Sequence, residues 1–427
     1  MWRNYSRQIL YGIGSFGASL LQQTMLLWVF YFYAPPAGQA LPMRLSASLV
    51  GIAMGAGRLV DALADPPIAY LSDRIRSRSG RRRPFILVGA PLLALSFALL
   101  WIPPQEQPGT ANFLYLATVL GAFYFLFTVV LNPYTALLPE ITAGGEGRID
   151  MAAWQAGFSL AGTAAAFVAS SALAGRFGFP VMGLVLAPVG MLALWTAALS
   201  VKEHPIVEPP VAFVPAARAV LRNRPFQIYL LGLALLWFGL SMVNLSTALV
   251  VTVLMGLPRS AVGTVLAVSI GLTLLSFPII GRLAKRAGKR RALLGAMVMA
   301  GLVVPLIGAI GWIPLPFSRV VQGYIVVTLA GPPLAALFVL PNAILADIAE
   351  HHGVVLGHRS EGLFFALQGL IFNGTTSLAA VTLGAVLEHF GYSAGSDLGL
   401  RVVPMIAAVS VGIGALVFTR FPDGPSH

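Results

Sequence analysis

The chain contains no cysteine, and Asp, Glu, Lys and Arg together make up only 10% of its 427 residues. Without cysteine no disulfide can form, although this does not identify a compartment. Hydrophobic residues account for 57% of the chain, more apolar surface than a soluble domain needs. No HExxH or GxSxG motif accompanies a plausible intramembrane site, which disfavours a membrane enzyme. The composition therefore indicates a membrane protein without an obvious catalytic centre.

Long apolar runs fill most of the chain, and a helix needs about 20 apolar residues to span a bilayer. We predict an all-α, multi-pass membrane protein with twelve transmembrane helices, near residues 10–34, 44–71, 84–103, 111–139, 150–174, 178–200, 226–255, 259–284, 291–313, 317–349, 361–390 and 399–420. The 45 glycines and 30 prolines fit this prediction, because small residues allow close helix contacts and helix breaks line cavities.

The net charge of +12 would suggest nucleic acid as a partner of a soluble protein. Here 21 of the 27 Lys and Arg residues lie in the termini and the even-numbered loops. This alternation follows the positive-inside rule, so we expect both termini to be cytoplasmic and the basic loops to face anionic lipid headgroups. The expected macromolecular environment is membrane lipid, with no nucleic-acid partner.

The chain divides near its middle at a polar, Pro-rich connection, residues 201–225. We predict a six-helix bundle over 1–200, a cytoplasmic linker over 201–225 and a second six-helix bundle over 226–427. The basic string SDRIRSRSGRRRP after the second predicted helix matches GRLAKRAGKRR after the eighth, with Gly80 and Gly288 corresponding. This repeat is typical of transporters with sites near the midplane between halves, and it disfavours a channel. The alternative is that short cytoplasmic loops are simply basic.

Two carboxylates, Asp61 and Asp65, lie one helical turn apart in an otherwise apolar run. A charge at the bilayer centre costs about 2.5–3.5 kcal/mol on insertion scales, so two on one helix require a reason. Side chains at this spacing share a face and repel unless a cation or proton lies between them. We therefore predict a cation site, with the alternative that Arg58 merely neutralises Asp61.

Pro66 and Pro67 follow this pair directly and lack N–H groups, which frees the carbonyls of Ala62 and Leu63. Such an oxygen-rich site suits Na⁺, or H⁺ on the carboxylates alone. A simple helix kink is the alternative reading of the prolines. The predicted coupling cation is therefore Na⁺ or H⁺, with no other cofactor.

The stretch GRLVDALADPPIAYLSDRIRSRSGRRRPFILVG (Gly57–Gly89) resembles the second-helix signature of the glycoside–pentoside–hexuronide:cation symporters, the melibiose-permease branch of the major facilitator superfamily. Three further family-like stretches follow the family's order: YGIGSFG (Tyr11–Gly17), NPYTALLPEIT (Asn132–Thr142) and ADIAEHHGVVLGHRSEGLFFALQG (Ala346–Gly369). The resemblance implies the major facilitator superfamily fold and symport by alternating access.

The family's cation-site positions fall on Asp61, Asp65 and Thr128, all of which keep the required oxygen atoms. Its charged or aromatic sugar-binding positions fall instead on Ser19, Leu131 (beside Asn132), Gln155, Phe338 and Asn373. The resemblance thus implies a cation site with few melibiose-type sugar contacts. We expect a weakly charged cavity between the halves for a neutral solute with apolar surface, with a lysolipid as the alternative substrate.

Other polar side chains in the predicted spans are Gln22, Gln23, Tyr33, Tyr124, Asn244 and Gln368. Gln22, Tyr124 and Gln368 are candidate substrate residues, although hydrogen bonding between helices is the more common role for any one of them.

Charge pairs at the cytoplasmic ends could separate inward-facing and outward-facing states. The candidates are Arg58, Asp73, Arg74, Arg76 and Arg81–Arg83 in the first half, and Asp347, Glu350, Arg359 and Glu361 in the second. For the arginines, a role in topology alone is the alternative. Glu350, His351, His352 and His358 have the composition of a metal site but weak spacing for one, so we predict no metal beyond a possible Na⁺ at Asp61 and Asp65.

Together these features predict a cation-coupled secondary symporter of a small solute, in the glycoside class by resemblance. We expect it to act as a monomer in a bacterial inner membrane.

Overall fold

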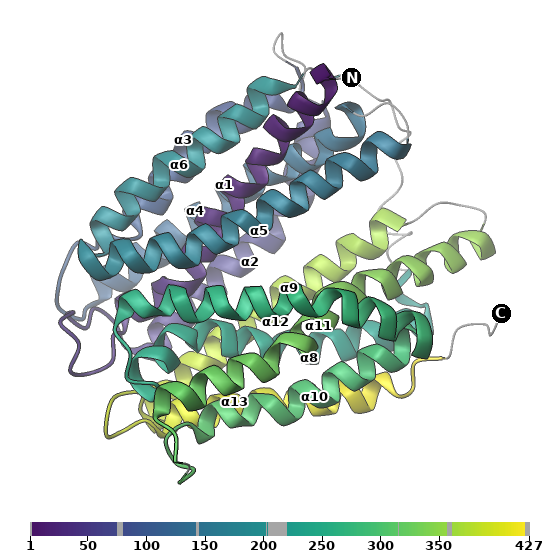
Figure 1. The fold of residues 1–427 in the computed structure, drawn as a ribbon. Coiled ribbons are helices and arrows are strands. Elements are labelled where there is room, and N and C mark those ends of the chain that lie inside the picture. Colours follow the sequence, from purple (N-terminus) through teal and green to yellow (C-terminus); the bar gives the residue numbers. More distant parts are fainter. Residues whose placement is uncertain are drawn as a thin grey trace. The chain divides into compact units, whose positions relative to one another are not determined.

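The computed structural model describes residues 2–74, 80–141, 145–201, 203, 220–314, 316–356 and 361–422 (Figure 1). Over these residues the chain forms α-helices joined by short connections. They are α1 (Trp2–Tyr33), α2 (Ala47–Arg74), α3 (Arg83–Leu99), α4 (Thr110–Ile141), α5 (Gly145–Arg176), α6 (Phe179–Ser200), α8 (Arg224–Leu249), α9 (Arg259–Ala287), α10 (Lys289–Ala309), α11 (Arg319–Leu356), α12 (Glu361–Phe390) and α13 (Leu398–Phe418). A short π-helix, Val250–Leu254, extends α8.

Eleven of these helices are long and apolar enough to cross a membrane. The twelfth, α3, has 17 residues and ends at Leu99, four residues before the end of the predicted span. Tight turns follow, with the Trp101 N–H donating to the Ala98 carbonyl, and Pro103 and Pro104 cannot continue a helix. The prediction of an all-α protein with twelve apolar helices is confirmed.

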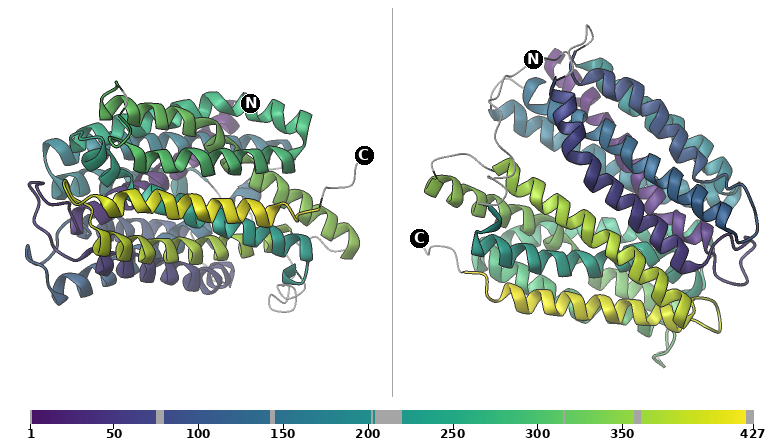
Figure 2. Two further views of the ribbon diagram at one scale, coloured as in Figure 1. Left: turned by 90° about the horizontal axis from the view of Figure 1, so that it is seen from below. Right: turned by 180° about the vertical axis from the view of Figure 1, so that it is seen from behind.

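The helices belong to two compact units, one of Met1–Glu208 with Pro258–Leu266 and the other of Pro209–Leu257 with Ala267–His427. In the first unit α1 packs against α5 and α6, α2 against α4, and α3 against α4 and α6. In the second, α8 packs against α12 and α13, and α10 against α11 and α13 (Figure 2). The predicted domain limits at 200 and 226 remain predictions.

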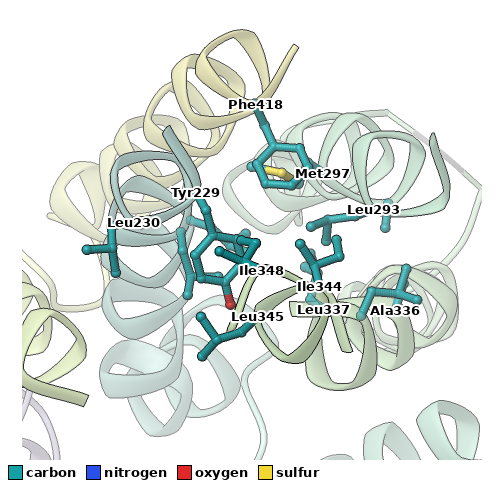
Figure 3. Packing of buried hydrophobic residues seen from close by; sticks show 14 of the residues in the cluster. Tyr229, Leu230, Leu293, Met297, Ala336, Leu337, Ile344, Leu345, Ile348 and Phe418 are labelled. Carbon is teal, nitrogen blue, oxygen red and sulfur yellow. The ribbon is translucent and has the colours of Figure 1, made fainter. Parts of the chain in front are cut away.

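The apolar core of the second unit surrounds Tyr229 of α8 (Figure 3). Leu337, Ile344 and Leu345 of α11 contribute buried side chains to this core, as does Phe418 of α13. Residues of α8 and α11 thus belong to one apolar core, and the opposite faces of these two helices point away from it.

The two units share two local features, a glycine turn before the third helix and an arginine that contacts the end of the last helix. Gly80 and Gly288, which the sequence pairs, both have positive φ angles (107° and 85°), and each lies just before the third helix of its unit. The Arg83 side chain then donates to the Ala198 carbonyl at the end of α6, and Arg290 donates to the Thr419 carbonyl at the end of α13. A cation at a helix C-terminus is favourable. The repeated basic strings therefore perform the same structural task in both units.

Candidate functional site

The predicted carboxylate pair lies where α2 packs against α4. Asp61 is 7% exposed, and its Oδ1 accepts a hydrogen bond from Thr128 of α4 at 2.7 Å. One turn further along both helices, Asn132 Nδ2 donates to Asp65 Oδ1 at 3.2 Å. The parallel register of α2 and α4 thus matches two carboxylates with one hydroxyl and one amide.

Arg58 completes this cluster from the preceding turn of α2. Its Nη1 lies 3.5 Å from Asp61 Oδ2, and the guanidinium lies 4.8 Å from the centre of the Tyr124 ring. The Arg58 side chain is almost fully buried, and its Nε has no hydrogen-bond partner in the described part of the chain. Two carboxylates and one guanidinium leave a single net negative charge. The ion pair expected as the alternative is present, yet it accounts for only one of the two aspartates.

Two predicted features of this region have plain structural outcomes. Helix α2 continues through Pro66 and Pro67 to Arg74, so the prolines lie inside a helix and do not end it. Tyr124 is fully buried, and its hydroxyl contacts Met25 Sδ at 3.9 Å. This position makes Tyr124 a support for Arg58, which favours the interhelical alternative over direct substrate contact.

The first unit contains a polar network between α1 and α4 that centres on Tyr134. The Tyr134 hydroxyl donates to the Tyr11 carbonyl at 2.8 Å and lies 3.0 Å from Ser15 Oγ. Ser19 Oγ lies 2.7 Å from Ser159 Oγ of α5, in a separate contact. Among the other candidate substrate residues of this unit, Gln22, Leu131 and Gln155 are partly buried. The described hydrogen bonds thus place neither Ser19 nor Gln155 in the network of Tyr134, a residue that sequence reasoning missed.

The second unit contains a corresponding network. The Tyr229 hydroxyl lies 2.9 Å from both the Pro341 carbonyl and Gln368 Oε1, and Gln368 Nε2 donates to Asn342 Oδ1 at 3.4 Å. Of the predicted residues, Gln368 belongs to this network, Phe338 is 55% exposed, and Asn373 is partly buried. The chain spacing between Gln155 and Gln368 resembles that between Tyr11 and Tyr229, and this internal repeat was the signal that could have found Tyr229.

The predicted charge networks are described in part. Asp347 pairs with Lys289 at 2.7 Å, so the basic string before α10 contacts the end of α11. In the first unit the backbone N–H groups of Arg82 and Arg83 donate to Glu203, which the sequence analysis did not single out. The side chains of Asp73, Arg74, Arg76, Glu350, Arg359, Glu361 and the candidate metal-binding histidines lie outside the described residues.

No group of three His, Asp or Glu side chains that could hold a metal occurs among the residues that the structure describes. The cluster of α2 and α4 brings two carboxylates and one hydroxyl together, and its role as a cation site stays a prediction.

Several known transport proteins are similar to this chain over most of its length. The uncharacterized symporter sll1374 of Synechocystis is 23% identical over 92% of this chain and 87% of its own length. The isoprimeverose transporter of Lactiplantibacillus pentosus is 24% identical over 96% of this chain and 87% of its own. The sodium-dependent lysophosphatidylcholine symporter 1 of Gallus gallus is 24% identical over 89% and 80%.

The crystal structure of the nucleoside transporter NupG has the same fold, with a TM-score of 0.71 at 14% identity, covering 97% of this chain and 98% of that one. The sequence model of the family described as MFS/sugar transport protein matches residues 10–419. The match covers every helix that carries the α2–α4 cluster and both polar networks. The chain is therefore a multi-pass membrane protein that belongs to the MFS/sugar transport family.

Proposed function

We propose that this protein is a cation-coupled symporter that moves a small neutral solute of the glycoside class by alternating access, without chemical change to the solute. The observation that carries the proposal is the cluster of Asp61 and Asp65 with Thr128 and Asn132 in a pair of long apolar helices, with Asp61 and Thr128 buried and the other two partly buried. Buried charges in membrane segments are costly and are typical of ion pathways.

The charge of the cluster supports coupling to one monovalent cation. With Arg58 beside Asp61, the site has one uncompensated negative charge, which a single Na⁺ or H⁺ would neutralise. Sodium would take oxygen ligands from the two carboxylates and Thr128, whereas a proton would reside on a carboxylate alone. Relatives named as symporters, one of them sodium-dependent, support a coupling cation of this kind.

A glycoside substrate is supported by the family and by an isoprimeverose-transporting relative. Ser19, Gln155 and Gln368 supply the hydroxyl and amide groups that would bind it. The site in the described residues has no carboxylate or lysine at the family's sugar-binding positions, which favours a neutral solute. We further propose a monomer in a bacterial inner membrane, with cytoplasmic termini and without a nucleic-acid partner.

A lysolipid is the second candidate substrate. The similarity to the lysophosphatidylcholine symporter supports it. The apolar side chains Leu131 and Phe338 support it too, because by resemblance the family has an aspartate at the first position and a tryptophan at the second. Of the two classes, the glycoside is favoured because hydrogen-bonding side chains line both networks.

Counterflow in proteoliposomes distinguishes the two. Vesicles loaded with unlabelled methyl galactoside, nitrophenyl galactoside or lysophosphatidylcholine would be diluted into the labelled form of the same compound. We expect overshoot with a galactoside and none with the lysolipid. Overshoot with lysophosphatidylcholine alone would replace the glycoside by the second candidate.

A further inference from the structure

Helices α10 and α13 of the second unit pack side by side in opposite directions (Figure 1). Two glycines of α10, Gly301 and Gly308, allow a close approach. A Cβ at Gly308 would lie 2.7 Å from the Arg401 carbonyl oxygen of α13, and a Cβ at Gly301 would lie 3.9 Å from that of Ala408. The two helices therefore meet through their backbones at these glycines, and their larger side chains lie beside the contact.

A cavity of about 440 Å³ lies where this helix pair ends. Its walls come from the end of α10, the loop that follows and the first two turns of α13, with Trp312, Ile313, Leu398 and Met405 among its apolar lining. Of the described residues that line it, Arg401 alone is charged. Ligand pockets have volumes of about 300–1,000 Å³, so this cavity is large enough for a ligand.

The charge of Arg401 is neutralised within the protein. Its Nη2 donates to Asp397 Oδ2 at 2.7 Å, and its Nη1 donates to the carbonyls of Gly308 at 2.6 Å and Ile310 at 2.9 Å. The guanidinium lies 4.3 Å from the centre of the Trp312 ring, a favourable cation–π distance. The cavity thus has apolar walls and a compensated charge, which suits an apolar occupant.

The exposed face of α13 continues the cavity along the helix. Met405, Val409 and Ile413 are all exposed, and they follow one another at four-residue spacing. Apolar side chains at this spacing lie on one face of a helix. An exposed apolar face of a membrane-spanning helix meets the hydrocarbon of the bilayer, since water would leave it without favourable contacts. The cavity therefore opens onto the surface that contacts lipid chains.

The length of α10 gives the depth of the cavity in the membrane. This helix has 21 residues, about 31 Å at 1.5 Å per residue, which matches a hydrocarbon core of about 30 Å. Lys289, at its start, therefore lies near one membrane surface, and Trp312, three residues beyond its end, lies near the other. Trp312 is 63% exposed, and tryptophan is enriched at the level of the headgroups. The cavity lies just below this level.

We propose that this cavity binds one acyl chain of a membrane phospholipid, in the leaflet away from Lys289. The chain lies against Leu398, Val402 and Met405, and the Trp312 indole N–H donates to an ester oxygen of the lipid.

This site lies apart from the α2–α4 cluster and from the polar networks, so it does not rest on the proposed function. Because Asp397 neutralises Arg401, zwitterionic and anionic phospholipids bind alike. A bound chain fills the space beside the contact between α10 and α13, and it stabilises the folded protein, as any ligand of the folded state does.

Native mass spectrometry of the purified full chain tests the site by titration with dioleoyl phosphatidylethanolamine and dioleoyl phosphatidylglycerol. We expect the parent to bind one lipid more than about tenfold more tightly than the next, with Kd values for the two headgroups within about twofold. Val402→Trp fills the cavity and should abolish the tight site. Val409→Trp makes the same change on the exposed face of α13, outside the cavity lining, and should keep it.

Three results of this titration would overturn the inference. They are the lack of a tight lipid in the parent, tight binding that survives in a folded Val402→Trp protein, and a headgroup preference greater than about twofold, which would show recognition of charge.

Photocrosslinking of the parent locates the lipid even if Val402→Trp does not fold. A phosphatidylethanolamine with a diazirine in its acyl chain is added to the detergent-solubilised protein in substoichiometric amount. We expect adducts on Trp312, Leu398 or Met405, which line the cavity. Adducts only at exposed positions outside it, such as Leu302 and Leu416, would contradict the site. Loss of the adducts in excess nitrophenyl galactoside would place the lipid on the solute path and also overturn the inference.

Discussion

At the scale of single residues, the main feature is the exact pairing of α2 with α4. Asp61 meets Thr128 and Asp65 meets Asn132, so each carboxylate has its own neutral partner from the neighbouring helix. Hydroxyl and amide groups satisfy a buried carboxylate without cancelling its charge. The charge of Asp65 therefore remains available to a cation, while Arg58 forms an ion pair with Asp61.

Thr128 offers a conservative test of this role. Thr128→Val keeps the shape of the side chain but removes the hydroxyl that donates to Asp61. Losing one partner of a buried charged group costs about 1–3 kcal/mol, so we expect the cation concentration for half-maximal uptake to change by about five- to a hundredfold. Cation titration of uptake measures this. Thr128→Ser retains the hydroxyl and should behave as the parent, and an unaltered Thr128→Val protein would remove Thr128 from the site.

The sequence predicted the α2 part of this cluster because its members lie at helical spacing in one family-like motif, whereas Thr128 followed from the family resemblance alone. Asp61, Asp65 and Arg58 share a face of any helix that contains them. Asn342 and Glu203 could not be found in this way, since their partners lie on other helices or at their ends. Which turn of α12 meets which turn of α11 depends on packing between helices, and local periodicity does not determine it.

At the scale of elements, the N-terminus of α3 is capped by a carboxylate from the chain after α6. The Glu203 carboxylate accepts hydrogen bonds from the backbone N–H groups of Arg82 at 3.0 Å and Arg83 at 2.7 Å. A carboxylate at a helix N-terminus satisfies donors that have no partner within the helix and complements the helix dipole. Glu203 thereby fixes the chain after α6 to the start of α3.

Removing this cap should lower stability. Glu203→Ala leaves the first N–H groups of α3 without their acceptor, which costs about 0.5–2 kcal/mol for a typical cap. We expect a lower Tm for the detergent-solubilised protein in a thermal unfolding scan. Glu106→Ala, at an exposed glutamate in the loop before α4, is the matched control and should leave the Tm unchanged. Equal Tm values for both variants would contradict the capping role.

The paired glycines give a second test at this scale. Gly80 and Gly288 both have positive φ, so alanine is strained at either position by about 1–3 kcal/mol. A Cβ at Gly80 would also lie 2.6 Å from the Glu203 carboxyl, whereas a Cβ at Gly288 would meet nothing within 4 Å. We therefore expect Gly80→Ala to lower the Tm more than Gly288→Ala does. The opposite order would show that the contact with Glu203 carries no energetic weight.

At the scale of the whole molecule, the two units share several internal features. Arginine caps at α6 and α13 and glycine turns before α3 and α10 recur in both units, whereas the close packing of α2 against α4 belongs to the first. The basic strings of both repeats follow the second helix of their unit, so the distribution of basic residues matches the repeat of helices. If each of the twelve described helices crosses the membrane once, an even number of crossings predicts that both ends of the chain lie on one side.

We predict that this side is the cytoplasm, from the 21 Lys and Arg residues in the termini and even-numbered loops. Ser426→Cys in the cysteine-free chain should resist an impermeant maleimide in intact cells and react after the cells are opened. Gln39→Cys, in the exposed loop before α2, is the control for the outer side. Arg44 in the same loop is less suitable, because its side chain makes a buried hydrogen bond. Labelling of Ser426→Cys in intact cells would reverse the orientation.

The central claim is that Asp61 and Asp65 couple a cation gradient to solute uptake. The most direct measurement is accumulation of labelled nitrophenyl galactoside in proteoliposomes under an inward Na⁺ or H⁺ gradient, for the parent, Asp61→Asn and Asp65→Asn. We expect accumulation above equilibrium by the parent and only equilibration or less by either variant. Size-exclusion chromatography checks that both variants fold, because Asp61→Asn leaves the buried Arg58 without its ion-pair partner. Accumulation by both variants equal to that of the parent would contradict the account.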